Sequence, residues 1–340
     1  MDNRISSLDY LRGLCSFSIM IYHYMLWTGY KVDANDFISR MGIYGVSIFY
    51  ILSGLTLYIV YKDRNFLDKS EWLSFFKKRV LRILPLFSLI TILTFFISRN
   101  FSYFSLKTLF LNVTGLFSIF SSDKYIVTGG WSVGNELFFY LLFPILMLFT
   151  KRISWIVACL LLSWGIAIYF AFFVLKNFSA LGGDSWKIYI NHFNQLFLFV
   201  SGIGIGKFLT SKQTDIILLL IFTLLIIIFI IFPVSGDIIQ IASGSNRIIF
   251  SILSVLICAS IYKLSISLPR FIFLPLLILG EISYGIYLIH PIIFKIVFKG
   301  VGRYFYNETI LFSISILLTL LVSYISYITI ERYFINLGKR

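Results

Sequence analysis

Long apolar runs recur along the whole chain and constrain its fold more than any other feature. The stretch ILLLIFTLLIIIFIIF at 217–232 contains no charged residue, and a helix that crosses a bilayer needs about 20 largely apolar residues. Of the 340 residues, 59% are hydrophobic and 13% are charged, too little charge to cover a water-soluble domain. The runs lack the alternation over about ten residues that marks membrane β-barrels. We therefore predict an all-α, polytopic integral membrane protein.

About ten transmembrane helices are predicted, which places both termini on one side of the membrane. Lysines and arginines gather at the chain ends and in the connections 62–82, 151–152, 207–212 and 263–270. Basic loops remain cytoplasmic, so we predict cytoplasmic N- and C-termini and a single membrane-embedded domain over residues 1–340. The ninth span contains Pro291 and is expected to kink there. The predicted spans are 8–29, 42–61, 77–98, 133–150, 153–175, 193–209, 214–233, 246–263, 272–298 and 308–332.

Charge and cysteine content exclude other classes of protein. A net charge of +14 suits anionic membrane lipids as partners, and no nucleic-acid partner is expected because no soluble basic domain is present. The three cysteines lie in apolar runs without metal-ligand spacing, so we predict neither a metal site nor a disulfide framework. Asp9 and Arg12 interrupt the first apolar run, which we expect to be a retained span and not a cleaved signal.

The first span, LRGLCSFSIMIYHYM at 11–25, carries a guanidinium at one end and an imidazole deep inside. Arg12 and His23 are eleven residues apart, about three turns, so they share one helix face about 16 Å apart along the axis. Asp9 is placed to pair with Arg12. One interpretation is a channel-lining stripe with His23 as a general base. The alternative is a histidine satisfied by a neighbouring helix, with Arg12 reaching the lipid headgroups.

Three further segments place polar side chains in apolar surroundings, where such groups are costly. FKKRVLRILP sets Arg79 and Arg82 one turn apart, suited either to a phosphate-bearing ligand or to ordinary anchoring at the cytoplasmic surface. WSVGNELFFYLLFP and GEISYGIYLIHP each carry a polar stripe at helical spacing. These stripes either line the same cavity or form hydrogen bonds between helices. Their members are Glu136, Tyr140, Ser283, Tyr287 and His290.

Small residues recur in GVSIFYILSG and SGIGIGKF. Gly202, Gly204 and Gly206 have the look of a GxGxG motif but no strand precedes them, so a dinucleotide site is not expected. Close packing between helices is the better explanation.

Taken in order, these motifs resemble the acyltransferase-3 family of membrane-bound acyltransferases. LDYLRGLCSFSIMIYH resembles the family's opening, an arginine followed by ten residues and a histidine. GVSIFYILSG resembles its second-helix motif, KKRVLRILP its Arg-x-x-Arg motif, and WSVGNELFFYLLFP and LGEISYGIYLIHP its later signatures. ITIERYF resembles its closing segment. The resemblance extends from residue 8 to about residue 334.

The resemblance implies an O-acyltransferase that moves an acyl group, usually acetyl, from cytoplasmic acyl-CoA to a hydroxyl of an extracytoplasmic glycan. It implies acetyl-CoA as a co-substrate and no tightly bound cofactor. By match, His23 and Glu136 are the catalytic residues and Arg12, Arg79 and Arg82 bind the donor. Asp9, Tyr140, Ser283, Tyr287 and His290 are expected to line the cavity.

Several points stay open at this stage. The acceptor is expected to be O-antigen, another surface polysaccharide or a lipid-linked glycan in the bacterial cytoplasmic (inner) membrane. Transfer either proceeds directly or passes through a covalent acyl-enzyme. Some relatives carry a fused esterase-like domain, whereas a stand-alone membrane domain is expected here. The main alternative is a glycan or lipid transporter without acyl transfer, which suits polar stripes in membrane helices equally well.

Overall fold

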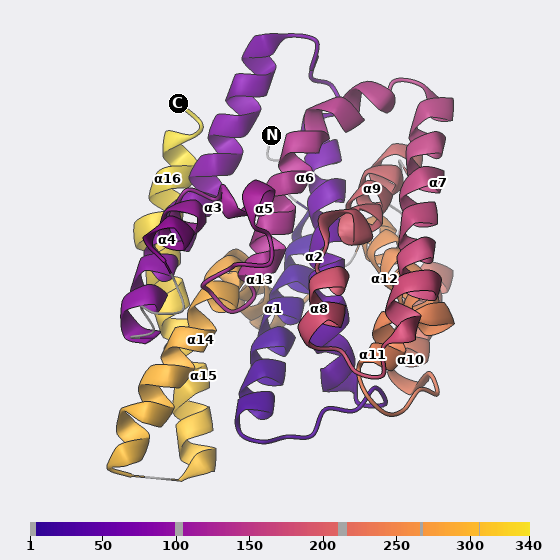
Figure 1. The fold of residues 1–340 in the computed structure, drawn as a ribbon. Coiled ribbons are helices and arrows are strands. Elements are labelled where there is room, and N and C mark those ends of the chain that lie inside the picture. Colours follow the sequence, from indigo (N-terminus) through magenta and orange to yellow (C-terminus); the bar gives the residue numbers. More distant parts are fainter. Residues whose placement is uncertain (1–4, 99–104, 210–215, 266–267, 306) are drawn as a thin grey trace.

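The computed structural model describes residues 5–98, 105–209, 216–265, 268–305 and 307–340. The basic residues Arg4 and Lys212, and residues 214 and 215 of the seventh predicted span, lie outside the described residues. Every regular element in the described ranges is helical (Figure 1). The elements are α1 (Ser6–Trp27), α2 (Phe37–Tyr61), α3 (Lys69–Ser98), α4 (Leu106–Val113), α5 (Phe117–Phe120), α6 (Gly130–Phe149), α7 (Ile153–Tyr169), η1 (Phe170–Val174), η2 (Leu175–Asn177), α8 (Gly183–Tyr189), α9 (His192–Phe208), α10 (Ile216–Ile231), α11 (Ile239–Ala242), α12 (Gly244–Lys263), α13 (Arg270–Glu281), α14 (Ser283–Lys299), η3 (Val301–Arg303), α15 (Glu308–Ser326), η4 (Tyr327–Glu331) and α16 (Arg332–Leu337).

Eight helical segments of the described chain are long and apolar enough to cross a membrane. They correspond to eight of the ten predicted spans. The other two predicted spans are α1, which is 22 residues long but carries several polar groups, and α10, which is described over 16 residues. The predicted fold class, an all-α polytopic membrane protein, is confirmed.

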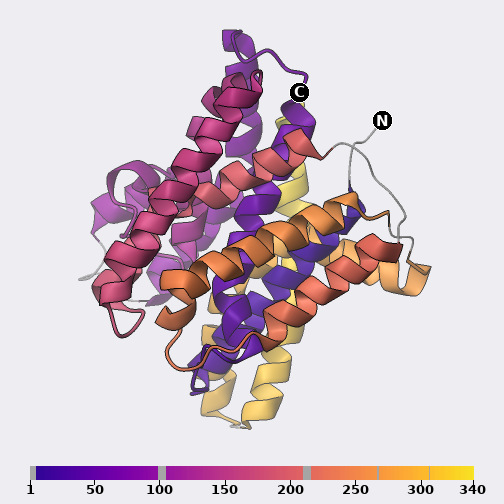
Figure 2. The same cartoon turned by 90° about the vertical axis from the view of Figure 1, so that its right-hand side faces the viewer.

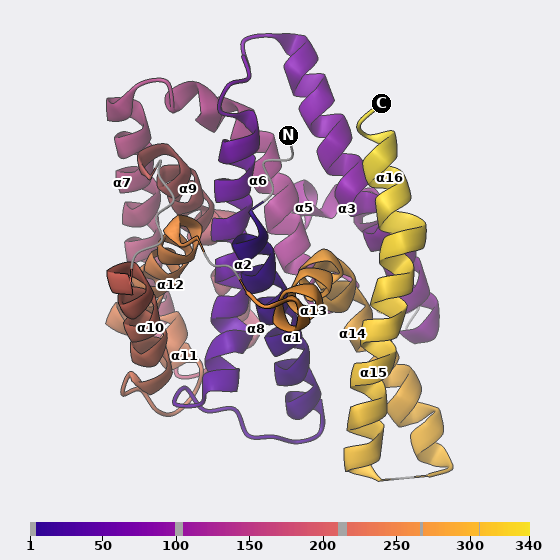
Figure 3. The ribbon, with the colours of Figure 1, turned by 180° about the vertical axis from the view of Figure 1, so that it is seen from behind.

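The ninth predicted span consists of two helices in the structure. The helix does not break at Pro291, which lies inside α14. The division falls at Ile282, between α13 and α14, where the backbone has φ −89° and ψ 3°. Gly280, just before it, is pressed against the first turn of α1, because a side chain there would meet the Asp9 main chain. The division lets α13 lie against α1 while α14 turns along α15 (Figure 3).

Two helices form the centre of the molecule. α1 packs against α2, α13 and α14, and α2 packs along α9. α7, α10 and α15 bury few of their residues. In α10, as described over Ile216–Ile231, Phe229 is the one buried residue. Figure 2 shows the coral α10 beside the orange α12 on the face of the bundle that is turned to the viewer. The polar residues of α1 are therefore enclosed, while the plain apolar helices cover the outside.

α1 begins and α16 ends at the same end of the bundle (Figures 1 and 3). The α2–α3 connection and the α6–α7 turn also meet, because Lys151 Nζ lies 3.4 Å from Asn65 Oδ1. The basic residues of these connections therefore gather at one end of the bundle, where a cytoplasmic surface requires them.

Alkaline phosphatase fused after Ser70 is expected to be inactive, and the same enzyme fused after Phe120 is expected to be active. Alkaline phosphatase folds only outside the cytoplasm, where its disulfides form. Activity would be measured in whole cells and divided by fusion-protein abundance. Activity in the Ser70 fusion alone would show that every helix crosses the membrane in the opposite orientation.

Candidate active site

His23 of α1 and His290 of α14 meet in the structure. Nδ1 of His23 lies 2.9 Å from Nε2 of His290, and the two ring planes are 10° apart. His290 is fully buried, whereas part of the surface of His23 is exposed. The pair therefore presents one accessible imidazole, backed by a second imidazole that solvent does not reach.

Neighbouring side chains fix this pair within three helices. Trp27, one turn after His23, stacks on its ring with centroids 5.2 Å apart and planes 8° apart. The Tyr24 hydroxyl donates to the His290 carbonyl at 3.1 Å and lies 2.7 Å from Oγ1 of Thr319 in α15. Hydrogen bonds buried in this way are strengthened by the low local dielectric. The histidines are consequently held by α1, α14 and α15 together.

Tyr287, which precedes His290 by three residues, joins α14 to the start of α6. Its hydroxyl lies 2.7 Å from Ser132 Oγ and donates to the Gly129 carbonyl at 3.1 Å. Gly129 has φ 78°, and a side chain there would meet the Tyr287 hydroxyl at 2.6 Å. Ser283 is placed differently, since its hydroxyl donates to the Gly280 carbonyl at 2.8 Å in the division between α13 and α14.

Glu136 and Tyr140 form a second polar cluster on α6. The Glu136 carboxyl group accepts hydrogen bonds from the Tyr140 hydroxyl and, at 3.0 Å, from Ser53 Oγ of α2. A carboxylate in apolar surroundings is tolerated only where such partners or a cation compensate it. The cluster thus joins α2 and α6 around one acidic group.

Three arginines surround this cluster. Arg12 contacts Asp9 at 3.7 Å and interacts electrostatically with Glu136 and with Arg82. The Arg79 guanidinium lies 6.0 Å from the Tyr140 ring centroid, and its buried Nε has no hydrogen-bond partner among the described residues. The acidic side chains near these guanidinium groups are Asp9, Glu136 and Glu331, the last through Arg82. Three guanidinium groups gathered in this way suit a polyanionic ligand. In the described chain, no three His, Cys, Asp or Glu side chains gather to hold a metal ion.

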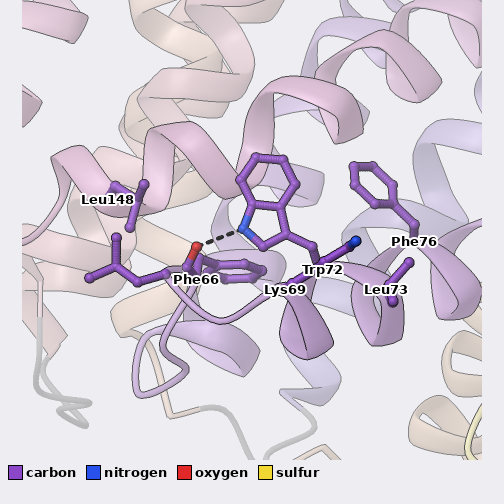
Figure 4. Close-up of a pocket in the computed structure, with 7 residues that line it drawn as sticks. Phe66, Lys69, Trp72, Leu73, Phe76 and Leu148 are labelled. Atoms are coloured by element: carbon purple, nitrogen blue, oxygen red, sulfur yellow. Dashed lines mark hydrogen bonds between the residues drawn. The ribbon is translucent and has the colours of Figure 1, made fainter.

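A cavity of about 600 Å³ opens beside the first turns of α3 (Figure 4). Trp72 and Phe76 line it and share one face of α3 with Arg79. The Trp72 indole N–H donates to the Phe66 carbonyl at 2.6 Å, which fixes the aromatic wall. Asp68 precedes α3 and accepts from the Ser70 N–H at 2.9 Å, and this hydrogen bond lowers the pKa of its carboxyl group. Phe76 thus sets the cavity one helical turn from Arg79, and neither His23 nor His290 lines it.

Two buried arginines were missed by the sequence analysis. Arg40 is fully buried and donates to carbonyls at the end of α10, including those of Phe229 and Ile230. It therefore compensates the unpaired carbonyls of a helix C-terminus. Arg247 donates to the Asn194 carbonyl at 2.9 Å. Nothing in the sequence separates these two from ordinary basic residues that flank a span.

The comparisons with known proteins identify the family of the whole chain. A family model described as an acyltransferase domain matches residues 5–328. The chain is 27% identical over 366 residues to O-acetyltransferase OatA of Staphylococcus aureus, in strains NCTC 8325 / PS 47, COL and MRSA252. The alignment covers 96% of this chain and 56% of each relative, so the chain spans about half their length. No solved structure gives a significant match. Because the family model spans nearly the whole chain, the protein belongs to the acyltransferase-3 family of membrane proteins.

Proposed function

We propose that the protein transfers an acetyl group from cytoplasmic acetyl-CoA to a hydroxyl of an extracytoplasmic glycan. The observation that carries this proposal is the pairing of a partly exposed His23 with a buried His290, on the helix whose other end enters the arginine cluster. The relatives are O-acetyltransferases by name, which supports acetyl as the group and a hydroxyl as its acceptor. The protein would act in the bacterial cytoplasmic membrane.

The arginine cluster and the histidine pair would have separate roles at different depths along α1. Arg12 lies in the first turns of α1 and interacts with Arg82 of α3, whereas His23 is eleven residues further along α1, about 16 Å. That rise is about half of a hydrocarbon core about 30 Å thick. The anionic nucleotide end of the donor would stay with the arginines, and its thioester would reach His23. The acceptor would approach from the opposite side, so the acyl group crosses the membrane without CoA.

The proposed reaction is a direct transfer. Nε2 of His23 accepts the proton of the acceptor hydroxyl as that oxygen attacks the thioester carbonyl carbon. The carbon–sulfur bond breaks, and the sulfur leaves with the proton from His23. The products are the acyl ester and free CoA thiol, and His23 returns to its neutral form. Ser283 would not carry the acyl group in this scheme, because its hydroxyl is turned toward Gly280.

The proposal is tested by following label from [acetyl-14C]acetyl-CoA into the glycan fraction of membranes that contain the protein. Label released by mild base, as expected for an ester, would support it. Membranes without the protein are the control. A protein that binds no acetyl-CoA and labels no glycan would instead be the transporter considered above. Acyl-protein trapped by rapid quench would replace direct transfer by a covalent acyl-enzyme.

Replacing Arg79 and Arg82 together by alanine is expected to abolish most of the thermal stabilisation by acetyl-CoA. A ligand at a hundredfold excess over its Kd stabilises by about 2.7 kcal/mol, and the two guanidinium groups would supply most contacts to the phosphates. The Tm of detergent-purified protein would be measured with and without acetyl-CoA. The matched control replaces Lys77 and Lys78, which removes two positive charges from the same helix. If acetyl-CoA raised the Tm of the arginine variant as much as that of the wild type, the nucleotide would not be bound by Arg79 and Arg82.

A further inference from the structure

We propose that His290 is a positioning residue that holds His23 in the one neutral tautomer whose Nε2 is a free base. The kinetic consequence rests on the acyl transfer proposed above. The tautomer itself can be observed without any substrate, so the two ideas can fail separately.

The main chain of α14 determines which nitrogen of His290 carries its proton. Nδ1 of His290 lies 2.9 Å from the Ile286 carbonyl oxygen. A carbonyl only accepts, so Nδ1 must carry the hydrogen. Pro291 has no N–H and leaves the Tyr287 carbonyl without its helical donor, and this carbonyl also interacts with the His290 side chain. The Ile286 carbonyl therefore holds the hydrogen on Nδ1 of His290.

This assignment fixes His23 in turn. With its proton on Nδ1, neutral His290 has only a lone pair on Nε2, 2.9 Å from Nδ1 of His23. A hydrogen bond at that distance requires His23 to donate from Nδ1. Nε2 of His23 is then unprotonated, and no residue in the described ranges forms a hydrogen bond with it. The base proposed for the reaction is thus already in the required form before any ligand binds.

The same contacts favour the protonated form of His23 that exists during the reaction. After Nε2 has taken a proton, Nδ1–H still donates to His290, so no hydrogen bond is lost. Trp27 lies parallel to the His23 ring with centroids 5.2 Å apart, and an aromatic face attracts a cation. His290 is fully buried, where a charge would be costly, so the proton remains on His23. The relation resembles that of the histidine and its orienting partner in a catalytic triad.

Nitrogen-15 NMR of protein labelled in histidine tests the tautomer directly. The chain has three histidines, and a His23→Gln variant identifies the signals of His23. In the wild type we expect His23 to be protonated on Nδ1 and bare on Nε2, without substrate. A wild-type His23 protonated on Nε2 would overturn the proposal. Absence of acyl transfer in the wild type would contradict the proposed function but leave this result standing.

A series at position 290 tests the kinetic consequence. In His290→Gln, the amide oxygen takes the place of Nε2 and accepts from His23, so kcat is expected within about tenfold of wild type. In His290→Phe the acceptor is lost, and kcat is expected to fall by about 10²-fold or more, with KM for acetyl-CoA unchanged. Rescue by glutamine and the loss confined to kcat would not follow from a packing role. A phenylalanine variant that folds and keeps the wild-type kcat would refute the assignment.

Discussion

His23→Ala is expected to lower acetyl transfer by about 10²–10⁴-fold, the usual contribution of a general base. The loss should appear in kcat and leave the binding of acetyl-CoA unchanged, because the arginines that would hold the donor are about three turns away. Transfer of label from acetyl-CoA to glycan would be measured in membranes at matched expression. The thermal shift with acetyl-CoA would be recorded on the same preparations.

Leu26→Ala is the matched control for this variant. Leu26 lies on the same helix, three residues from His23, and its side chain is 37% exposed on the outside of the bundle. It should keep both transfer and the thermal shift. Incorporation of label by His23→Ala at the wild-type rate would show that the protein is an acyltransferase whose base is not His23.

Gly202→Ala is expected to destabilise the protein by about 3 kcal/mol, the upper end of the typical range for overpacking. A methyl group there would meet the carbonyl oxygen of Ile51 and, at 2.8 Å, the nitrogen of Leu55. Both are main-chain atoms of α2, which do not turn aside as a side chain does. The Tm of detergent-purified protein, together with gel filtration, would measure the effect.

Gly204→Ala provides the control for this substitution. The two glycines belong to the same helix, but a methyl group on Gly204 would meet only the Leu160 side chain, at 3.3 Å. Since alanine favours helix over glycine by about 0.8–1.0 kcal/mol, this variant should be as stable as wild type or slightly more so. Equal loss in both variants would show that the close approach of α2 and α9 is not the cause.

The sequence predicted the helices well, because an apolar run long enough to cross the bilayer identifies a membrane-spanning helix by itself. It also predicted close packing at SGIGIGKF, which is confirmed where Gly202 meets α2. It could not locate the division at Ile282, because the polar residues of GEISYG fit a stripe on one continuous helix equally well. Pro291 lies inside α14, and a helix in a membrane tolerates proline where neighbouring groups satisfy the freed carbonyl.

The candidate site was only partly accessible from the sequence. Helical spacing placed Arg12 and His23 on one face, and Tyr287 and His290 on another. It could not show that the two faces meet, because the hydrogen bond between the histidines joins residues 267 positions apart. Trp27 was overlooked although it follows His23 by one turn, because a tryptophan near a helix end also suits the membrane interface.

The long separation between His23 and His290 also orders events during biosynthesis. At roughly 5–20 residues per second, translation of the intervening 267 positions lasts on the order of tens of seconds. Throughout that time α1 resides in the membrane without the imidazole that orients its histidine. A nascent chain, or one truncated before α14, therefore lacks the partner of His23 and would lack the site of the proposed acyl transfer. The protein would become able to catalyse the proposed transfer only late in its insertion by the translocon, after nearly all the other helices are in place.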